Sequence, residues 1–260
     1  MVLTIDIGNT KTKIAVFRGK QLMEYIVVEQ INNNHINELI NKFEKIEHSI
    51  ISSVNADEEQ RVANLFDKLG LNCHLLSHKS PLPFEIDYLT PETLGKDRIA
   101  ALAGAYAVNG EGNYLVIDCG TCNTYDLLID GHFVGGNIAP GIQMRLDAMH
   151  HFTAALPQCS IQNAKPTTLS LGEKFTIDKS LGETTKTAML NGAYWGVLHE
   201  IKGYIERYSQ EFESLKVILT GGLFNLQIVN ISQLSTLNSQ LFVEPMLVPK
   251  GLNYIANSLE

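Results

Sequence analysis

Two segments of this 260-residue chain repeat one pattern, in which an apolar strand ends in Asp, the chain turns through Gly with a Thr close by, and a second apolar strand follows. The residues that carry the pattern are Asp6, Gly8, Asn9 and Thr10 in the first segment and Asp118, Gly120 and Thr121 in the second. Glycine lets a backbone approach an anion closely, and Asn and Thr side chains supply neutral hydrogen-bond donors. The repetition predicts two phosphate-binding hairpins that grip a nucleotide and its metal from both sides of a cleft.

Each hairpin taken alone has a simpler interpretation, because Asp-x-Gly is a common sequence in tight turns. One copy would favour an ordinary turn. The second copy, with similar flanking strands, favours the phosphate site.

Composition narrows the class of protein. A length of 260 residues is suited to two lobes of about 100 to 150 residues each. The net charge of −8 and the scattered Lys and Arg argue against a nucleic-acid partner, which requires a concentrated basic patch. The chain enters an apolar strand directly after Met1 without the features of a signal peptide, and no apolar run approaches the ~18 residues of a membrane span. We therefore expect a cytoplasmic protein without a membrane partner.

The four cysteines are expected to be reduced thiols in such a protein. Cys119 and Cys122 form a Cys-x-x-Cys motif, which elsewhere binds zinc or performs redox chemistry. Here Gly120 and Thr121 of the second hairpin lie inside the motif and no companion pair follows, so metal or redox chemistry is disfavoured.

The apolar spacing predicts an α/β fold in two related halves. In the first half the expected elements are strands at 2–6, 13–17 and 24–28, a helix at 36–46, a strand at 49–54, a helix at 57–69 and a strand at 73–76. The second half begins again with strands at 114–118, 124–129 and 132–134, a Gly-rich turn at 135–141 leading into a helix, a long helix, a strand at 217–219 and a further helix. An Ala-rich helix running from Gly95 to about Val108 is expected to link the halves.

This order corresponds to two βββαβα lobes, one over residues 1–109 with the first phosphate loop and the linking helix, and one over residues 110–260 with the second phosphate loop and an adenosine loop. Five motifs lie between or at the ends of these elements, in this order along the chain: Asp6-x-Gly8-Asn9-Thr10-x-x-Lys13, Gly95-x-Asp97-Arg98, Asp118-x-Gly120-Thr121, Gly135-Gly136-x-Ile138-x-Pro140-Gly141 and Thr220-Gly221-Gly222.

In this order and spacing the motifs resemble those of type III pantothenate kinases, over essentially the whole chain. The resemblance implies duplicated actin-like (ribonuclease H-like) lobes with an ATP cleft between them. It also implies ATP-dependent phosphorylation of pantothenate, the first step of coenzyme A biosynthesis. One departure is that Cys122 stands where family members usually have Ala, and Cys119 where they often have an aromatic residue.

Asp97 is the expected catalytic base, because phosphoryl transfer to a hydroxyl needs a carboxylate that accepts the proton. Without the resemblance, Asp97 would be interpreted as an acidic residue favoured by the helix dipole. Arg98 beside it is expected to donate hydrogen bonds to a hydroxyl or carboxylate of the substrate. The alternative is that Arg98 belongs to an exposed ion pair.

The resemblance assigns ATP binding to a run in the first hairpin and one residue in the second: Asp6, Ile7, Gly8, Asn9, Thr10, Lys11, Thr12, Lys13 and Thr121. Asp6 is expected to orient a hydrated Mg²⁺, since magnesium usually keeps several waters. Lys13 could instead be an ordinary lysine on the surface of its strand. Asp118 resembles the family's ligand for a monovalent cation, K⁺ or NH₄⁺, although the residues themselves do not distinguish that ion from Mg²⁺.

Pantothenate binding is implied for Tyr88, Gly95, Lys96, Asp97, Arg98 and Thr185. Alone, Tyr88 would be a loop aromatic packed on the core, and Thr185 a helix N-cap. The resemblance further implies a homodimer whose substrate pocket lies at the interface, with the helix of Thr185 coming from the neighbouring subunit.

Three other functions compete. Some chains that resemble these kinases have been regarded as accessory factors for transcription, but an ATP sensor has no need of a base such as Asp97. A kinase for another small hydroxylated substrate, such as a sugar, differs in acceptor preference alone. An Hsp70-like chaperone is disfavoured because no substrate-binding domain follows the second lobe.

Overall fold

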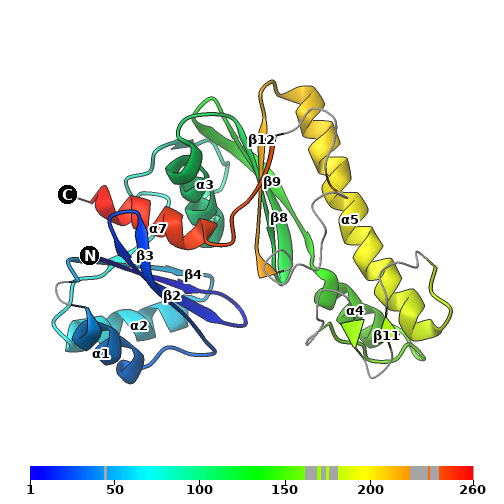
Figure 1. The fold of residues 1–260 in the computed structure, drawn as a ribbon, viewed down its shortest axis with the longest axis horizontal. Coiled ribbons are helices and arrows are strands. Elements are labelled where there is room, and N and C mark those ends of the chain that lie inside the picture. Colours follow the sequence, from blue (N-terminus) through cyan, green and yellow to red (C-terminus); the bar gives the residue numbers. More distant parts are fainter. Residues whose placement is uncertain are drawn as a thin grey trace. The chain divides into compact units, whose positions relative to one another are not determined.

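The computed structural model of the chain describes residues 1–43, 46–161, 169–170, 174–175, 181–222, 234 and 240–259 (Figure 1). The chain divides into two compact units. The first comprises Met1–Gly112, Leu128–Gly135 and Met246–Glu260, and the second comprises Asn113–Leu127 and Gly136–Pro245. None of the helices in the described ranges is both long and apolar enough to cross a membrane.

A five-stranded sheet forms the centre of the first unit, in the order β3-β2-β1-β4-β5. Its strands are β1 (Val2–Ile7), β2 (Thr12–Arg18), β3 (Gln21–Val28), β4 (His48–Ser53) and β5 (His74–Leu75). The first three are antiparallel neighbours, whereas β1, β4 and β5 run parallel. Every residue of β1 is buried, as expected for a central strand covered on both faces.

Two pairs of helices cover this sheet, α1 (Asn33–Lys42) with α2 (Ala56–Lys68) and α3 (Lys96–Asn109) with α7 (Leu247–Asn257), and Figure 1 shows the sheet between them. Asparagine caps start α1 and α2: the side chains of Asn32 and Asn55 each accept hydrogen bonds from two backbone N–H groups of the first turn. The apolar faces of these helices pack on β1, β2 and β4 in one core.

Glycines allow α3 and α7 to approach closely. A Cβ on Gly104 would overlap the carbonyl oxygen of Leu247, and a Cβ on Gly251 would overlap that of Ala100. The close approach fixes the C-terminal helix on the helix that begins at the Gly95 motif.

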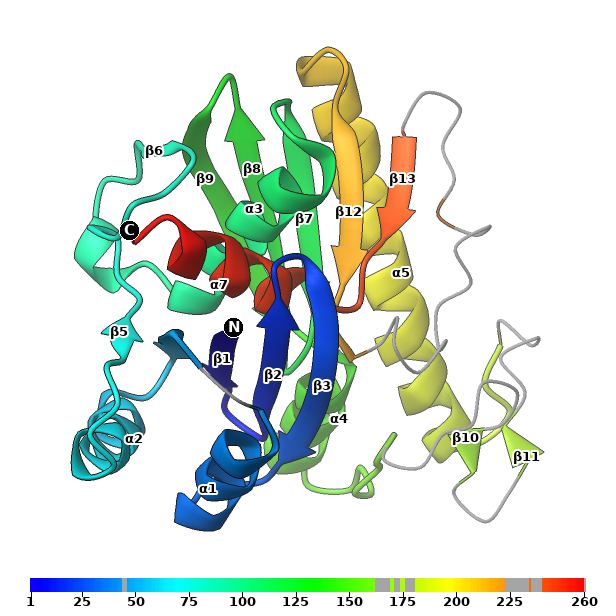
Figure 2. The same cartoon turned by 60° about the vertical axis from the view of Figure 1, so that its left-hand side comes forward.

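A second sheet has the order β13-β12-β7-β8-β9-β6 (Figure 2). Its strands are β6 (Glu85–Ile86), β7 (Tyr114–Cys119), β8 (Cys122–Ile129), β9 (His132–Pro140), β12 (Lys216–Thr220) and β13 (Gln240–Val243). The order β9-β8-β7-β12-β13 repeats β3-β2-β1-β4-β5 of the first sheet, and β7, β12 and β13 are again parallel. The two halves therefore share one topology, to which β6 adds an edge strand parallel to β9.

The remaining described elements are the helices α4 (Ile142–His151) and α5 (Thr185–Glu211), the short 3₁₀ helix η1 (Pro91–Thr93) and the two-residue strands β10 (Leu169–Ser170) and β11 (Lys174–Phe175). The long helix α5 packs on β7 and on α4. Its N-cap is Thr184, whose side chain forms a capping box with Thr187.

Three sequence expectations differ from this structure. The predicted turn at 135–141 is wrong, because Gly135 to Pro140 continue strand β9 and only Gly141 precedes α4. The helix predicted at 36–46 begins three residues earlier, after the cap at Asn32, and ends at Lys42. Instead of two lobes divided after residue 109, the first unit also takes Leu128–Gly135 and the C-terminal helix. The further helix expected after Gly222 lies outside the described residues.

Candidate active site

The first hairpin turns through four exposed residues between β1 and β2. The turn is closed by a hydrogen bond of 3.1 Å from the backbone N–H of Gly8 to the carbonyl oxygen of Lys11, and Asn9 and Thr10 lie exposed at its tip. Ile7 and Thr12 face each other in the flanking ladder with buried side chains, so they can reach an anion only through their backbones. The turn presents polar groups suited to phosphate.

Asp6 lies at the end of β1 with only 4% of its surface exposed. Its cross-strand partner in the ladder is Lys13, whose Nζ is 3.1 Å from Asp6 Oδ2. Lys13 is therefore not an ordinary surface lysine: it compensates a buried carboxylate.

Asp97 lies in the first turn of α3, where its Oδ1 accepts a hydrogen bond of 2.9 Å from the backbone N–H of Arg98. Burial raises the pKa of Asp97, and the nearby negative charge of Asp6 raises it further, against the opposing effects of that hydrogen bond and of the Arg98 charge. A raised pKa is a property of general bases, since it increases proton affinity.

Gly95 makes room for this carboxylate. A Cβ at position 95 would lie 2.6 Å from Asp97 Oδ1, which is closer than unbonded atoms approach. Gly95 is the N-cap residue of α3 and offers no side-chain cap, so the Asp97 carboxylate caps the helix in its place. The spacing Gly-x-Asp thus has a steric reason.

Arg98 is buried, with 5% of its surface exposed, so the alternative of an exposed ion pair is wrong. The guanidinium carbon lies 5.5 Å from the ring centroids of both Tyr88 and Phe133, within the range of cation–π attraction. The two rings stack on each other with centroids 5.8 Å apart. The structure brings Tyr88 and Arg98 together, as the expectation of a shared substrate pocket requires.

Lys96 also has a fixed position. Its Nζ lies 2.6 Å from both carboxylate oxygens of Glu59, a largely buried residue of α2. The ion pair ties the first turn of α3, and with it Asp97, to α2.

The second hairpin, in the other unit, is shorter than the first. Gly120 and Thr121 are exposed and form the whole connection between β7 and β8, and the backbone N–H of Gly120 donates to the carbonyl oxygen of Cys122 at 3.0 Å. Gly141 packs against this turn: its N–H donates to the carbonyl oxygen of Thr121, and a Cβ would clash with the carbonyl oxygen of Gly120. Burial raises the pKa of the Cys119 thiol, which keeps it from acting as a thiolate ligand or nucleophile.

Asp118 lies near the end of β7, beside Thr220 in the parallel ladder with β12. Gly221 follows with a positive φ of +97°, and a Cβ there would overlap Asp118 Oδ1 and lie 2.5 Å from the carbonyl oxygen of Cys119. The Thr-Gly-Gly motif therefore packs directly against Asp118 and Cys119 of the second hairpin.

Thr185 is the exposed first residue of α5. The cap is Thr184, so the alternative that Thr185 caps the helix is wrong by one residue.

The family model of type III pantothenate kinases matches residues 2–207. This chain belongs to the type III pantothenate kinase family. Relatives of that name include the protein of Christiangramia forsetii, which is 37% identical with 98% of this chain and 97% of the relative covered, and that of Bacteroides fragilis, which is 35% identical with 99% and 98% covered.

Solved structures show the fold of this pantothenate kinase family member. A putative 2-dehydro-3-deoxygalactonokinase from Sinorhizobium meliloti has a TM-score of 0.60 at 15% identity, covering 100% of this chain and 97% of that one. A putative Baf family transcriptional activator from Campylobacter jejuni has a TM-score of 0.57 at 20% identity, with 98% of both chains covered. These likenesses show the fold, an α/β fold in which one sheet topology occurs twice.

Two contributors to the site of this pantothenate kinase family member were missed from the sequence. Glu59 reads as one of three acidic residues at the start of a helix, and Phe133 as one apolar residue of a strand. No sequence signal marks either one, because Glu59 lies 37 residues from Lys96 and Phe133 lies 35 residues from Arg98 along the chain.

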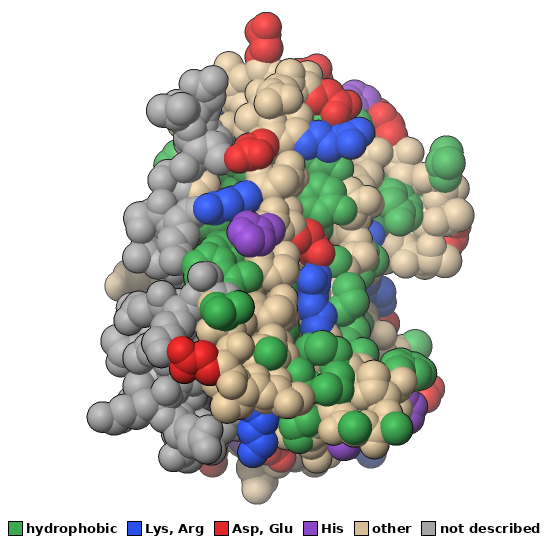
Figure 3. All heavy atoms as spheres, turned by 90° about the vertical axis from the view of Figure 1, so that its right-hand side faces the viewer, with side chains coloured by type: hydrophobic (Ala, Val, Ile, Leu, Met, Phe, Trp, Pro, Cys, Tyr) green, Lys and Arg blue, Asp and Glu red, His purple; other side chains and the backbone are tan. Residues whose placement is uncertain are grey.

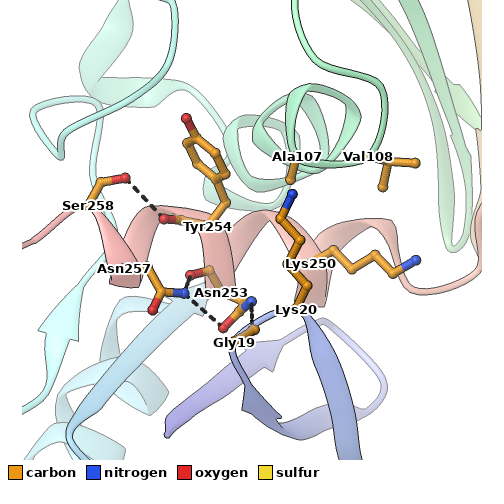
Figure 4. A pocket seen from close by; sticks show the side chains of 9 residues that line it. All are labelled: Gly19, Lys20, Ala107, Val108, Lys250, Asn253, Tyr254, Asn257 and Ser258. Atoms are coloured by element: carbon orange, nitrogen blue, oxygen red, sulfur yellow. Dashed lines mark hydrogen bonds between the residues drawn. The ribbon is translucent and has the colours of Figure 1, made fainter.

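A cavity of about 560 Å³ lies elsewhere in the first unit and contains none of the predicted site residues (Figure 4). It is bordered by the β2–β3 turn and α7, which are joined by a hydrogen bond of 2.9 Å from the Asn253 side chain to the carbonyl oxygen of Gly19. The side chain of Asn257 donates in turn to Asn253. These amides are engaged in holding α7 on the turn.

Proposed function

We propose that this chain transfers the γ-phosphoryl group of ATP to the primary hydroxyl of pantothenate, with Asp97 as the base. The chain is an ATP-dependent kinase of the pantothenate kinase family, whose reaction belongs to coenzyme A biosynthesis and uses ATP with a divalent metal. The observation that carries the proposed mechanism is the carboxylate of Asp97, which the backbone N–H of Arg98 holds in the first turn of α3 and whose pKa is raised by burial and by the charge of Asp6.

In the proposed mechanism Asp97 orients the pantothenate hydroxyl and accepts its proton late in the transfer, because the transition state is loose and the nucleophile loses its proton only as the new bond forms. A raised pKa favours this acceptance. The hydrogen bond from the Arg98 N–H holds the carboxylate in place, so little orientational entropy is lost in the reaction.

We propose that Arg98 and Tyr88 bind the pantothenate chain and its carboxylate. The Arg98 guanidinium lies beside the stacked rings of Tyr88 and Phe133, and this contact orients its planar donors. Lys96 is engaged by Glu59, so we assign it to fixing the first turn of α3, and Gly95 to leaving space for Asp97.

The first hairpin fits the phosphates of ATP, since its turn combines a glycine backbone with exposed Asn9 and Thr10. We propose that the run from Asp6 to Lys13 binds them, that Thr121 contributes from the second hairpin, and that Asp6 holds Mg²⁺ through water. Mg²⁺ when bound neutralises charge on the phosphate oxygens.

Asp118 fits a cation site as well, because Gly221 leaves a cradle against its carboxylate that a Cβ would fill. We propose that it binds K⁺ or NH₄⁺.

We further propose a homodimer in which Thr185 of one subunit completes the pantothenate pocket of the other. Large apolar side chains that are exposed in the second unit support an interface near α4 and the start of α5: Ile138, Met144, Phe152 and Leu181. Figure 3 shows a face of the molecule on which apolar side chains are interspersed with charged ones. Because the reaction consumes ATP, we place it in the cytoplasm.

The test is a coupled ADP-release assay with ATP, Mg²⁺ and pantothenate, run in K⁺, NH₄⁺ or Na⁺. Asp97→Asn should lower kcat by about 10²- to 10⁴-fold, the usual contribution of a general base, and leave ATP affinity unchanged. Asp57→Asn is the matched control, since Asp57 also lies in a first helical turn but outside the site.

Asp118→Asn should remove the difference between K⁺ and Na⁺. If ADP release did not depend on pantothenate in any salt while ATP still bound, the acceptor assignment would be wrong.

A further inference from the structure

Three side chains of types that can ligate metals lie together on the ladder between β6 and β9, and the proposed kinase mechanism does not use them. Glu85 of β6 and His132 of β9 are direct partners in the parallel register. Asp87 continues the ladder, because its backbone N–H donates to the carbonyl oxygen of Phe133 at 3.1 Å. Since side chains alternate along a strand, Glu85 and Asp87 project to one face, and His132 lies beside them.

The ligand atoms of these residues converge. His132 Nδ1 lies 3.1 Å from Asp87 Oδ2 and 3.8 Å from Glu85 Oε2, and one ligand atom from each residue lies within 4.8 Å of the other two. Ligands bound to one zinc ion at 2.0–2.2 Å in tetrahedral geometry are separated by roughly 3.4 Å. The two distances from His132 Nδ1 are close to that spacing, and all three side chains are exposed enough to adjust.

We propose that Glu85, Asp87 and His132 form a binding site for a divalent first-row transition metal, with Zn²⁺ as the best fit. One imidazole and two carboxylates are all ligands that zinc accepts, and zinc imposes no geometric preference of its own. Three protein ligands leave a fourth position for water.

The competing arrangement is a protonated imidazole paired with two carboxylates. In that case His132 Nδ1 should donate a hydrogen bond to Asp87. Within the described residues, however, Nδ1 is enclosed and has no hydrogen-bond partner, although Asp87 Oδ2 is only 3.1 Å away. The direction of approach is therefore wrong for a hydrogen bond, while an ion between the two atoms would satisfy both.

A bound ion would join β6 to β9. The short strand β6 is held by the backbone hydrogen bonds from Glu85 to Gly131, of 2.9 Å, and from Asp87 to Phe133. The residue after Asp87 is Tyr88, which stacks on Phe133. Metal binding is thus expected to stabilise the edge strand that precedes Tyr88, and this expectation does not depend on the identity of the kinase substrate.

The test is calorimetric titration of the full chain with ZnCl₂, without nucleotide or chelating buffer. His132→Ala and the near-isosteric Asp87→Asn should each lose one binding site per chain or weaken it by about 10-fold or more, because even indirect changes at metal sites cost 10- to 100-fold. His78→Ala, which alters a partly exposed histidine outside the cluster, should retain that site. Equal stoichiometry and affinity in all four proteins would overturn the proposal and leave the cluster as an ion pair.

Hydrogen exchange of individual backbone amides gives a second readout. It reports on β6 itself, so zinc bound elsewhere on the chain would not change it. At a Zn²⁺ concentration 100 times the dissociation constant, the amides of Glu85 and Asp87 should exchange up to about 100-fold more slowly in the unmodified protein, and no more slowly in Asp87→Asn. Unchanged exchange in the unmodified protein at saturating Zn²⁺ would also overturn the proposal.

Discussion

Gly95→Ala tests whether the position of the Asp97 carboxylate, rather than its presence alone, supports catalysis. The new Cβ would lie 2.6 Å from Asp97 Oδ1, whereas ordinary contacts begin at 3.4 Å, so the carboxylate has to move by about 0.8 Å. Because a misplacement of about 1 Å can cost 100-fold in rate, we expect kcat to fall by about 10- to 100-fold, or up to about 2.7 kcal/mol.

The same substitution should have little effect on stability. The obstructed atom is the end of a side chain that can rotate, and losing its helix-capping hydrogen bond costs about 1 kcal/mol. Replacing Gly by Ala returns about 0.4–1 kcal/mol by restricting the unfolded chain. The two effects nearly cancel, so Tm should stay within about 4 °C of the unmodified value.

The assay is steady-state ADP release over a range of pH, with thermal unfolding measured on the same samples. Because burial is the main cause of the raised pKa of Asp97, a displaced and better hydrated carboxylate should shift the acid limb of kcat/KM to lower pH. Gly203→Ala is the control, since within the described part of the chain its Cβ would meet no atom within 4 Å. A Gly95→Ala enzyme with unchanged kcat and pH profile would refute the assignment of Asp97.

Asp97→Asn should raise the free energy of unfolding at pH 7, because burial penalises the charged carboxylate. Since its folded pKa lies above the unfolded value of about 3.9, urea titrations should show this gain shrink as the pH falls through the raised pKa and vanish below about 4. Gly221→Ala should lower the free energy of unfolding by at least about 2 kcal/mol, since φ is +97° and the Cβ would meet backbone; Gly222→Ala, with open space around its Cβ among the described residues, should cost far less in the same titration. Glu59→Gln should cost about 1–3 kcal/mol, because Lys96 then keeps a partly buried charge without its carboxylate, and denaturant unfolding at pH 7 would detect it.

Elements with a strong local signal could be predicted from the sequence. The two hairpins have apolar strands on each side of a glycine turn, and the predicted strands agree with β1, β2, β7 and β8 to within two residues. The helix start at Asn55 is encoded locally, since the Asn side chain bonds to the first turn of its own helix.

Elements that depend on distant partners could not be predicted in this way. Gly135 and Gly136 favour a turn by local propensity, but pairing within the sheet holds them in an extended strand. The C-terminal helix joins the first unit because Gly251 lies against the backbone of Ala100, a contact that no local pattern reveals.

The same distinction between local signals and distant partners applies to the candidate site. The sequence by itself predicts Asp6, Asp97 and Asp118 as residues for phosphoryl transfer, because they occur in motifs whose residue types and spacing are read directly. Only the tertiary structure decided their environments: Asp97 acquires a raised pKa by burial beside Asp6, and Arg98 lies against the ring of Phe133, which is 35 residues away along the chain. The physical reason is that burial and electrostatic coupling depend on distances through space, which separation along the chain does not encode.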